Sequence, residues 1–399
     1  MANVSSSNGL EKRPKLRFPG FDEPWKPITF GDLVHEYSDR TKEEDEDTLL
    51  SAAIEGMFLN TELFGHQRGA SNKGYKKIKY GTMVLSTQNL HLGNANVNQR
   101  FEHGMVSPAY KTYDIAGCSV DLIAQWIKSD AAKRFFYNAT TVGASVCRRN
   151  VEWDTLYEQA LCLPCRDEQE KVAKFLGLLS NRINKQQQFV SALKKYKRGL
   201  LNKVFSNING NIYPTVYLSE VADFLQGLTY SPSDVSVSGY LVLRSSNIQN
   251  GVLSFDDCVY VDKKVDESLQ VKCDDVIMCV RNGSKKLVGK TALIPNNMAM
   301  TTWGAFMMII RSKLNDTYIF HYLNSQMFFS QVFKDTGTAT INQITKGILN
   351  ECKLPLPPET ARKQISKMLS SFDVKIQNAE MCLTTLVELK KALLQQLFI

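Results

Sequence analysis

The chain has 399 residues and a formal net charge of +8, and apolar residues make up 43% of it. This length allows two or three domains with cores of their own, and the composition is that of a globular protein. No run of about 18 apolar residues appears, which argues against a membrane span. Residues 1–24 are expected to form a loose polar leader rather than a secretory signal. Nine irregularly spaced cysteines indicate reduced thiols in a cytoplasm.

The positive charge is unevenly distributed. Between Arg166 and Lys203 there are ten Lys or Arg residues and three Asp or Glu residues, an excess of seven. A basic excess of this size fits a polyanionic partner. A solvated helix face has the same composition, so charge alone leaves both interpretations open.

An internal repeat is the clearest pattern in the sequence. Residues 163–206 align with residues 356–399 at a constant shift of 193, without a gap over 44 positions. Leu163-Pro164 falls on Leu356-Pro357, and Leu200-Leu201 falls on Leu393-Leu394. Self-similarity at a fixed shift indicates that one structural unit occurs twice.

Both copies of the repeat carry apolar residues that step alternately by four and three. This 3.5-residue period keeps one apolar seam facing a partner helix, and the lack of proline predicts one helix of about 40 residues, about 60 Å long, in each copy. We expect the copies to pair antiparallel within the chain; a homodimeric coiled coil is the alternative. Gln186, Lys197 and Lys390 interrupt the seams and would fix the register. The predicted seam residues are Val172, Leu176, Leu179, Ile183, Leu193, Leu200, Ile365, Leu369, Phe372, Ile376, Leu386 and Leu393.

The segments before the two helices match more weakly. Residues 25–34 align with residues 213–222, and residues 79–85 with residues 272–278, where a turn leads into a buried strand. Residues 140–145 and 335–340 occupy equivalent places. The predicted fold class is α+β, with two mixed α/β domains separated by two long antiparallel helices. The expected parts are a leader (1–24), a first domain (25–162), a central helix (163–207), a second domain (208–355) and a distal helix (356–399).

The sequence offers no convincing catalytic centre. Asn282–Thr291 resembles a phosphate-binding loop, but five residues instead of four separate Gly283 from Gly289, and no helix pattern follows. Cys162 and Cys165 have the spacing of a zinc half-site but lack a second pair of ligands. The consecutive acidic residues 43–47 should diverge into solvent rather than cluster around a metal ion. We therefore expect no catalytic residue, metal or cofactor in this chain.

Polar and basic clusters do recur in loops at matching points of the two domains. Arg, Lys, Asn and Gln read base edges, while Ser, Thr and Lys commonly anchor phosphates. Any one of these residues is more often an ordinary surface residue, so the recurrence locates regions better than individual contacts. The candidate DNA-binding residues are Arg68, Lys73, Lys76, Lys77, Thr87, Gln88, Asn89, Arg148, Arg149, Arg244, Ser245, Asn247, Arg281, Asn282, Ser284, Lys285, Lys286 and Thr338.

The duplicated layout resembles the specificity subunit of type I restriction-modification systems. The resemblance runs from Trp25 to Ile399 and rests on two Leu-Pro-led helices, which end in LKKYKRGLLNKVF and LVELKKALLQQLF. It implies a non-catalytic protein in which each target-recognition domain reads one half of a split, asymmetric DNA site and the helices act as spacer. A coiled-coil scaffold that joins two protein-binding domains without binding DNA is the alternative.

The resemblance also implies the partners of the chain. These are double-stranded DNA, two modification (methyltransferase) subunits that dock on the helices, and restriction subunits that translocate and cleave DNA. S-adenosylmethionine, ATP and Mg would be bound by those partners and not by this chain.

Overall fold

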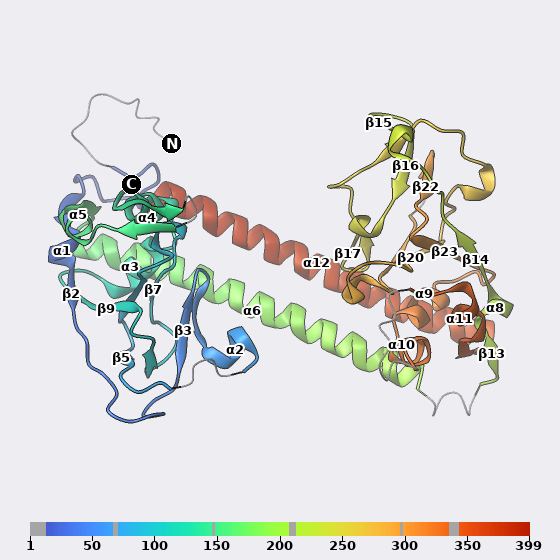
Figure 1. Cartoon of the computed structure of the whole chain (residues 1–399), viewed down its shortest axis with the longest axis horizontal. Helices are drawn as coiled ribbons and strands as arrows, with labels where there is room; N and C mark the ends of the chain where they lie inside the picture. The colour runs from blue at the N-terminus through green and yellow to red at the C-terminus, as the bar shows by residue number, and fades with distance from the viewer. Residues whose placement is uncertain (1–12, 67–70, 146–147, 207–212, 296–297, 335–342) are drawn as a thin grey trace. The chain divides into compact units, whose positions relative to one another are not determined.

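The computed structural model describes residues 13–66, 71–145, 148–206, 213–295, 298–334 and 343–399, with only the backbone of residues 143–145 and 148. The chain divides into two units, one made of residues 1–187 and 381–399 and the other of residues 188–380. Each unit combines a domain of mixed helices and sheets with parts of two long helices, α6 (Arg166–Val204) and α12 (Glu359–Leu397) (Figure 1). The α+β class and the two-domain organisation predicted from the sequence are confirmed.

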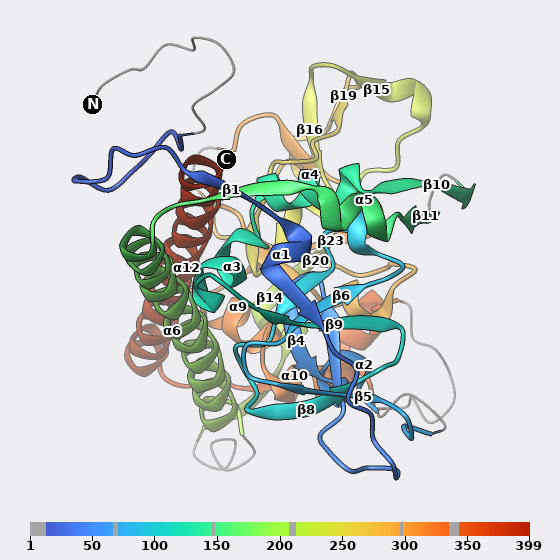
Figure 2. The ribbon, with the colours of Figure 1, turned by 90° about the vertical axis from the view of Figure 1, so that its left-hand side faces the viewer.

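The first unit is built on a four-stranded sheet with the order β2-β9-β6-β7. Figure 2 looks onto this unit and shows β9 and β6 side by side near α1. Its elements before α6 are β1 (Lys26–Thr29), α1 (Phe30–Leu33), β2 (Val34–Glu36), β3 (Leu50–Ala53), β4 (Gly56–Leu59), α2 (Asn60–Phe64), β5 (Lys76–Lys79), β6 (Met83–Ser86), η1 (Leu90–Leu92), β7 (Ala95–Val97), β8 (His103–Val106), β9 (Tyr110–Ile115), α3 (Val120–Trp126), α4 (Asp130–Asn138), β10 (Thr140–Ser145), β11 (Arg148–Val151), α5 (Trp153–Glu158) and β12 (Ala160–Leu163).

The second unit repeats this plan with a sheet of order β14-β23-β20-β21. Its elements before α12 are β13 (Thr215–Tyr217), α8 (Leu218–Val221), β14 (Ala222–Gln226), η2 (Pro232–Asp234), β15 (Val235–Ser236), β16 (Tyr240–Leu243), η3 (Ser245–Asn247), β17 (Ile248–Gln249), β18 (Val252–Leu253), β19 (Tyr260–Val261), η4 (Glu267–Leu269), β20 (Val276–Cys279), η5 (Lys285–Leu287), β21 (Thr291–Leu293), β22 (Thr301–Trp303), β23 (Met307–Ser312), α9 (Tyr318–Leu323), α10 (Gln326–Val332), α11 (Lys346–Glu351) and β24 (Lys353–Pro355).

Strand register shows that the two sheets are copies of one framework. Val34 pairs with Ile115 in the first sheet, and Ala222 pairs with Ser312 at the same place in the second. The helices α1 and α8 differ by the shift of 188 residues read from the sequence, and β6 and β20 differ by the shift of 193. Both weak sequence alignments therefore mark equivalent elements, as predicted.

The two long helices contain 39 residues each, close to the predicted length. The burial pattern follows the predicted seams, because all twelve seam residues are buried or half-buried while most of their neighbours are exposed. In the second unit Lys194 pairs with Glu380 at 2.6 Å and Lys197 pairs with Asp373. Partner numbers rise as the α6 numbers fall, so the helices run antiparallel there and the seam is closed within one chain.

The polar seam positions occupy equivalent places in the two units. In the first unit Lys390 Nζ donates a hydrogen bond of 2.7 Å to Ser180 Oγ. The shift of 193 places Lys197 on Lys390 and Ser180 on Asp373, so each seam lysine reaches the same position of the opposite helix. Burial lowers the pKa of Lys390, whose hydrogen-bond partner is a hydroxyl instead of a carboxylate.

The ends of both long helices complete the domain cores. In the first unit Leu176 of α6 shares a core with Phe398 and Leu397 at the end of the chain. The ring of Phe398 meets Trp25 edge-on at 6.4 Å. In the second unit Phe205, which follows α6, shares a core with Leu369 of α12. Each domain therefore depends on both long helices for its core, because residues of both helices bury part of its apolar surface.

Candidate nucleic-acid interface

In the second unit, the loop after strand β20 lies against the turn before strand β23. The backbone N–H groups of Val280 and Arg281 donate hydrogen bonds of 3.0 and 3.2 Å to the carbonyl oxygen of Phe306. The Arg281 guanidinium also lies 5.3 Å from the centre of the Phe306 ring. Both side chains are exposed, so this end of the sheet presents a cation beside an aromatic ring.

A second loop joins this region through a side-chain hydrogen bond. Asn282 Nδ2 donates to Ser245 Oγ at 3.2 Å, which connects the β20 loop to η3. Arg244, just before η3, pairs with Asp257 at 2.8 Å and keeps about a third of its side chain exposed. The predicted residues of these two loops thus converge on one end of the second unit.

Lys285 and Lys286 extend the same loop. Both are exposed, and neither forms an ion pair with a residue that the structure describes. Ser284 N–H donates to Asn282 Oδ1 at 3.0 Å, which fixes the start of this segment. The two free ammonium groups are well suited to phosphate contacts, which depend on charge rather than on base geometry.

The first unit carries other residues at the equivalent position. Thr87, Gln88 and Asn89 follow β6, and Thr87 Oγ1 donates to the carbonyl oxygen of Ala109 at 2.9 Å. Gln88 and Asn89 are exposed. The shift of 193 places Gln88 on Arg281 and Asn89 on Asn282, so one of these two positions carries a different polar group and the other keeps its asparagine.

Two predicted residues leave the candidate set because their polar groups are used inside the fold. Lys76 is 5% exposed, and its Nζ donates to the carbonyl oxygen of Tyr110 at 2.8 Å. Asn247 is fully buried; its Oδ1 accepts from Arg244 N–H at 2.9 Å and its Nδ2 donates to two carbonyl oxygens of the following loop at 3.0 Å. Both side chains hold loops together and are closed to an external ligand.

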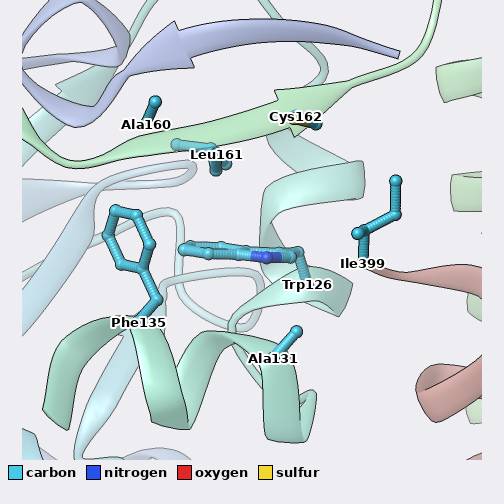
Figure 3. Close-up of a pocket in the computed structure, with 7 residues that line it drawn as sticks. All are labelled: Trp126, Ala131, Phe135, Ala160, Leu161, Cys162 and Ile399. Atoms are coloured by element: carbon cyan, nitrogen blue, oxygen red, sulfur yellow. The ribbon is translucent and has the colours of Figure 1, made fainter. Parts of the chain in front are cut away.

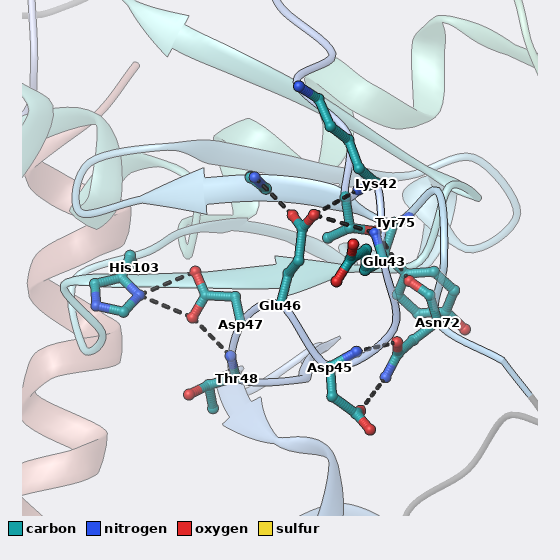
Figure 4. Close-up of polar contacts among 11 residues, drawn as sticks. Lys42, Glu43, Asp45, Glu46, Asp47, Thr48, Asn72, Tyr75 and His103 are labelled. Atoms are coloured by element: carbon teal, nitrogen blue, oxygen red, sulfur yellow. Dashed lines mark hydrogen bonds and ion pairs between the residues drawn. The ribbon is translucent and has the colours of Figure 1, made fainter.

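The acidic run is largely exposed, as the sequence suggested, but three of its carboxylates also contact other side chains. Asp45 bonds Asn72 Nδ2 at 2.6 Å, Glu46 pairs with Lys77 at 2.8 Å and Asp47 meets His103 Nδ1 at 2.8 Å (Figure 4). The Lys77 ammonium and two backbone N–H groups lower the pKa of Glu46 to about 2. Lys77 is therefore neutralised within the chain, whereas Lys73 is exposed without such a partner among the described residues.

The hairpin of β10 and β11 holds the last predicted cluster. Arg149 donates to the hydroxyl and the carbonyl oxygen of Thr140 at 2.7 and 2.6 Å and lies 4.2 Å from the Tyr137 ring centre. Its guanidinium is thus held in place by the hairpin. Arg148 lies on β11, but its side chain is outside the described residues, as are Arg68 and Thr338 altogether.

The structure adds Phe306 to the candidate residues, although no pattern in the sequence distinguishes it. In the printed sequence, Trp-Gly-Ala-Phe-Met-Met-Ile-Ile has the composition of a buried strand. Trp303 and Met307 are indeed buried, whereas Phe306 between them is 60% exposed. Only the turn geometry reveals that its ring points outward beside Arg281.

The first unit contains a small cavity that none of these loop residues lines. A cavity of about 60 Å³ in the first unit lies around Trp126, Leu161 and Ile399 (Figure 3). It is lined mainly by apolar side chains and falls far below the several hundred Å³ typical of ligand pockets. Among the described residues no three His, Cys, Asp or Glu side chains are placed to share a metal ion. No helix in that part is long and apolar enough to cross a membrane.

The two α+β units, with paired long helices and polar loops at the same end of each sheet, define a protein with a duplicated fold. Residues 213–386 match the family model described as the type I restriction modification DNA specificity domain. The type I restriction enzyme StySPI specificity subunit of Salmonella potsdam is 26% identical over 188 residues, which cover 45% of this chain and only 40% of that protein.

Two further similarities extend over most of the chain. The MjaVIII specificity subunit of Methanocaldococcus jannaschii is 22% identical over 390 residues, 91% of this chain and 88% of that protein. The crystal structure of the type I S subunit from M. genitalium has the same fold, with a TM-score of 0.59, 14% identity and coverage of 97% of this chain and 99% of that one. These similarities confirm the resemblance to type I restriction-modification specificity subunits that was drawn from the sequence.

Proposed function

We propose that each unit reads one half of a split, asymmetric DNA site. The observation that carries this proposal is the pair of equivalent loops after β6 and β20, which start from the same framework and carry Gln88-Asn89 in one unit and Arg281-Asn282 in the other. Gln suits adenine, while Arg suits guanine, so the position occupied by Gln88 in one loop and Arg281 in the other would select different bases.

We also propose that the long helices set the spacing between the half-sites and bind the methyltransferase subunits. Both helices expose apolar side chains outside the seam: Phe175, Leu178, Met381 and Val387 in the first unit, and Phe189, Tyr196, Met368 and Val374 in the second. Exposed apolar surface of this extent on a solvated helix supports a protein partner. Two such surfaces match two modification subunits.

Catalysis belongs to the partners in this proposal. The methyltransferase subunits would bind S-adenosylmethionine and methylate adenine, and restriction subunits would use ATP and Mg for translocation and cleavage. The loops described above contain hydrogen-bond donors and cations suited to recognition, and the chain would act by placing its partners on a chosen sequence.

Expression of the chain with its methyltransferase, followed by genome-wide mapping of methylated adenines, tests the function. We expect one split motif with a fixed spacer and two different halves. Unchanged methylation after removal of the gene for this chain would contradict the proposal.

The scaffold alternative makes a different prediction for binding in solution. Gel-shift titrations of the complex with its mapped motif should show tight binding that weakens steeply with salt, because phosphate contacts release counterions. A complex that assembles normally but binds no DNA would instead support a scaffold that joins protein-binding domains.

A further inference from the structure

The exposed ring of Phe306 is held by an unusually well-fixed turn. Its carbonyl oxygen accepts the two backbone hydrogen bonds from the β20 loop, and Gln226 Nε2 donates to the carbonyl oxygen of Ala305 at 2.7 Å. The preceding Gly304 lies so close to Gly227 that a Cβ at position 227 would overlap the Gly304 carbonyl. A side chain on such a turn loses little conformational freedom when it binds, which favours its use as an anchor.

The surroundings of Phe306 indicate the chemistry of its partner. Arg281 lies over one side of the ring, and Lys285 and Lys286 are exposed on the same loop without carboxylate partners among the described residues. An aromatic ring among cations suits a polyanion with stackable bases, since base–aromatic stacking and phosphate neutralisation act together there. An apolar protein surface would have no use for the three cations.

The first unit lacks this ring. Tyr110 is the first residue of β9 and pairs with Ser86 of β6, while Met307 is the first residue of β23 and pairs with Cys279 of β20. The residue before each strand is Ala109 in the first unit and Phe306 in the second. The Ala109 carbonyl oxygen accepts a hydrogen bond from the Thr87 hydroxyl, whereas the Phe306 carbonyl oxygen accepts two from backbone N–H groups. The first unit therefore joins its turn to the β6 loop through a side chain and carries alanine in place of the aromatic ring.

We propose that Phe306 inserts its ring against the base stack in the half-site read by the second unit, with Arg281 beside it on a base edge or phosphate. The ring partly unstacks one base step there, and the first unit makes no such contact. The second half-site is therefore read in part through the ease with which one step opens, which favours a flexible pyrimidine–purine step. This inference rests on the proposed function and adds a specificity-determining residue to it.

The experiment uses the complex of the chain with its methyltransferase and duplexes that carry 2-aminopurine at successive positions of the mapped motif. With the native chain we expect increased fluorescence at one step of one half-site. Phe306→Ala should abolish that increase and weaken binding roughly tenfold, the size expected for one lost stacking contact. Phe306→Leu, which keeps an apolar wedge, should retain part of both effects.

A matched control exists in the same unit. Tyr217 is also an exposed ring beneath a cation, with Lys353 Nζ 4.8 Å from its centre, but it lies on β13 and not on the candidate loops. Tyr217→Ala should leave both the fluorescence and the affinity unchanged. The melting temperature of each variant, measured alongside, verifies that it is folded.

Several outcomes would overturn the inference. If folded Phe306→Ala keeps the native fluorescence pattern and affinity, the ring does not contact the base stack. If it weakens binding to all sequences equally without changing fluorescence, the ring supports the loop and reads no base step. Both results leave the proposed function standing, whereas a native complex that binds no DNA would contradict the proposed function itself.

Discussion

Arg281 and the pair Lys285 and Lys286 lie on one loop but carry different functional groups. Arg281 projects from a fixed backbone position beside Phe306, which suits a bidentate contact to a base. The two lysines are solvated ammonium groups on η5, which suit phosphates. Under the proposed function, Arg281 would read the DNA sequence, while the two lysines would attract DNA of any sequence.

This separation gives a paired prediction. Arg281→Ala should reduce discrimination at one half-site only, by about 1 to 3 kcal/mol per mismatched base pair. The double variant Lys285→Ala with Lys286→Ala should weaken binding to all sequences and lower the slope of log K against log salt by about two. Competition titrations with single-mismatch duplexes at three salt concentrations distinguish the two effects. Equal losses at both half-sites for Arg281→Ala would contradict the assignment.

His321 is a second residue whose surroundings define its behaviour. It is fully buried on α9, where its Nε2 lies 3.1 Å from Ser370 Oγ of α12. Burial, with a smaller effect of the nearby Lys197 ammonium, lowers its pKa to about 3. Asp373 lies 3.9 Å from its Nδ1 but is already paired with Lys197. The imidazole is therefore neutral in the folded chain.

This neutrality makes the chain sensitive to acid. In the unfolded chain His321 becomes protonated below about pH 6.5, whereas in the folded chain it stays neutral until about pH 3. The free energy of unfolding therefore keeps its full value above pH 6.5 and decreases as the pH falls from 6.5 towards 3. The loss is up to about 1.4 kcal/mol per pH unit. His321→Gln should reduce the difference between the free energies of unfolding measured with urea at pH 7 and at pH 5.5.

An exposed histidine supplies the control. Asp47 raises the pKa of His103, so its contribution is present at low pH and lost as the pH rises through its folded value. His103→Gln should therefore leave the acid-induced loss in place. If both variants reduce the loss of stability at acidic pH equally, His321 is not the residue that causes this loss.

Among the elements, the contact between the domain and its long helix differs between the two units. Gln125 and His321 occupy equivalent positions in the two units, each four residues before the serine that caps α4 or α10. His321 is bonded to Ser370, whereas the position equivalent to Ser370 in the first unit is Gly177. Gln125 Oε1 has no hydrogen-bond partner among the described residues, and Gln125 and Gly177 line a hollow of about 680 Å³.

Refilling this position should stabilise the first unit. Nothing lies within 4 Å of a Cβ built on Gly177, so Gly177→Ala should raise the free energy of unfolding by about 0.5–1 kcal/mol through helix propensity. Gly177→Ser has a weaker propensity gain but adds a hydroxyl for Gln125, worth about 1 kcal/mol. In a Gln125→Ala background the serine variant should lose that extra gain. Urea unfolding of the two single Gly177 variants, of Gln125→Ala and of Gln125→Ala with Gly177→Ser measures this extra gain. A gain that is unchanged in the Gln125→Ala background would mean that the serine hydroxyl bonds to another group.

The sequence predicts the long elements well and the local polar contacts poorly. The seams follow from a 3.5-residue period, which is written in consecutive residues and needs no knowledge of the rest of the chain. The sheet order could not be derived, because β6 lies between β9 and β7 through pairings that join distant segments. Lys76 was misjudged for the same reason, since the carbonyl that accepts its hydrogen bond lies 34 residues away. Phe306 was missed because an exposed ring inside an apolar run cannot be recognised before the turn is known.

The whole molecule combines a repeated framework with loops that differ. The helix pair keeps its seam in both copies, whereas Thr87 and Gln88 after β6 are replaced by Val280 and Arg281 after β20. The proposed spacer role belongs to the framework, and base recognition belongs to the loops. The two properties should therefore change independently when one of them is altered.

Lengthening the helices tests this independence. Insertion of seven residues near Gln188 in α6 and seven near Met381 in α12 preserves the 3.5-residue seam and adds about 10 Å of helix. We expect the methylated motif to keep both halves while its spacer grows by up to about three base pairs, at roughly 3.4 Å each. Methylome mapping of cells with the altered chain gives the answer. A motif with the original spacer would contradict the spacer role of the helices.

The seating of Leu397 and Phe398 in the first core affects how the chain folds as it is made. A ribosome releases the first domain early, yet that core lacks these two buried residues until helix α12 has been synthesised. The second unit is one continuous stretch, residues 188–380, and can close before the chain is finished. We therefore expect the second unit to fold first and the first unit to complete its core only after Leu397 and Phe398 have been made. A chain that terminates shortly before Leu397 would then contain a folded second unit and an incompletely folded first unit.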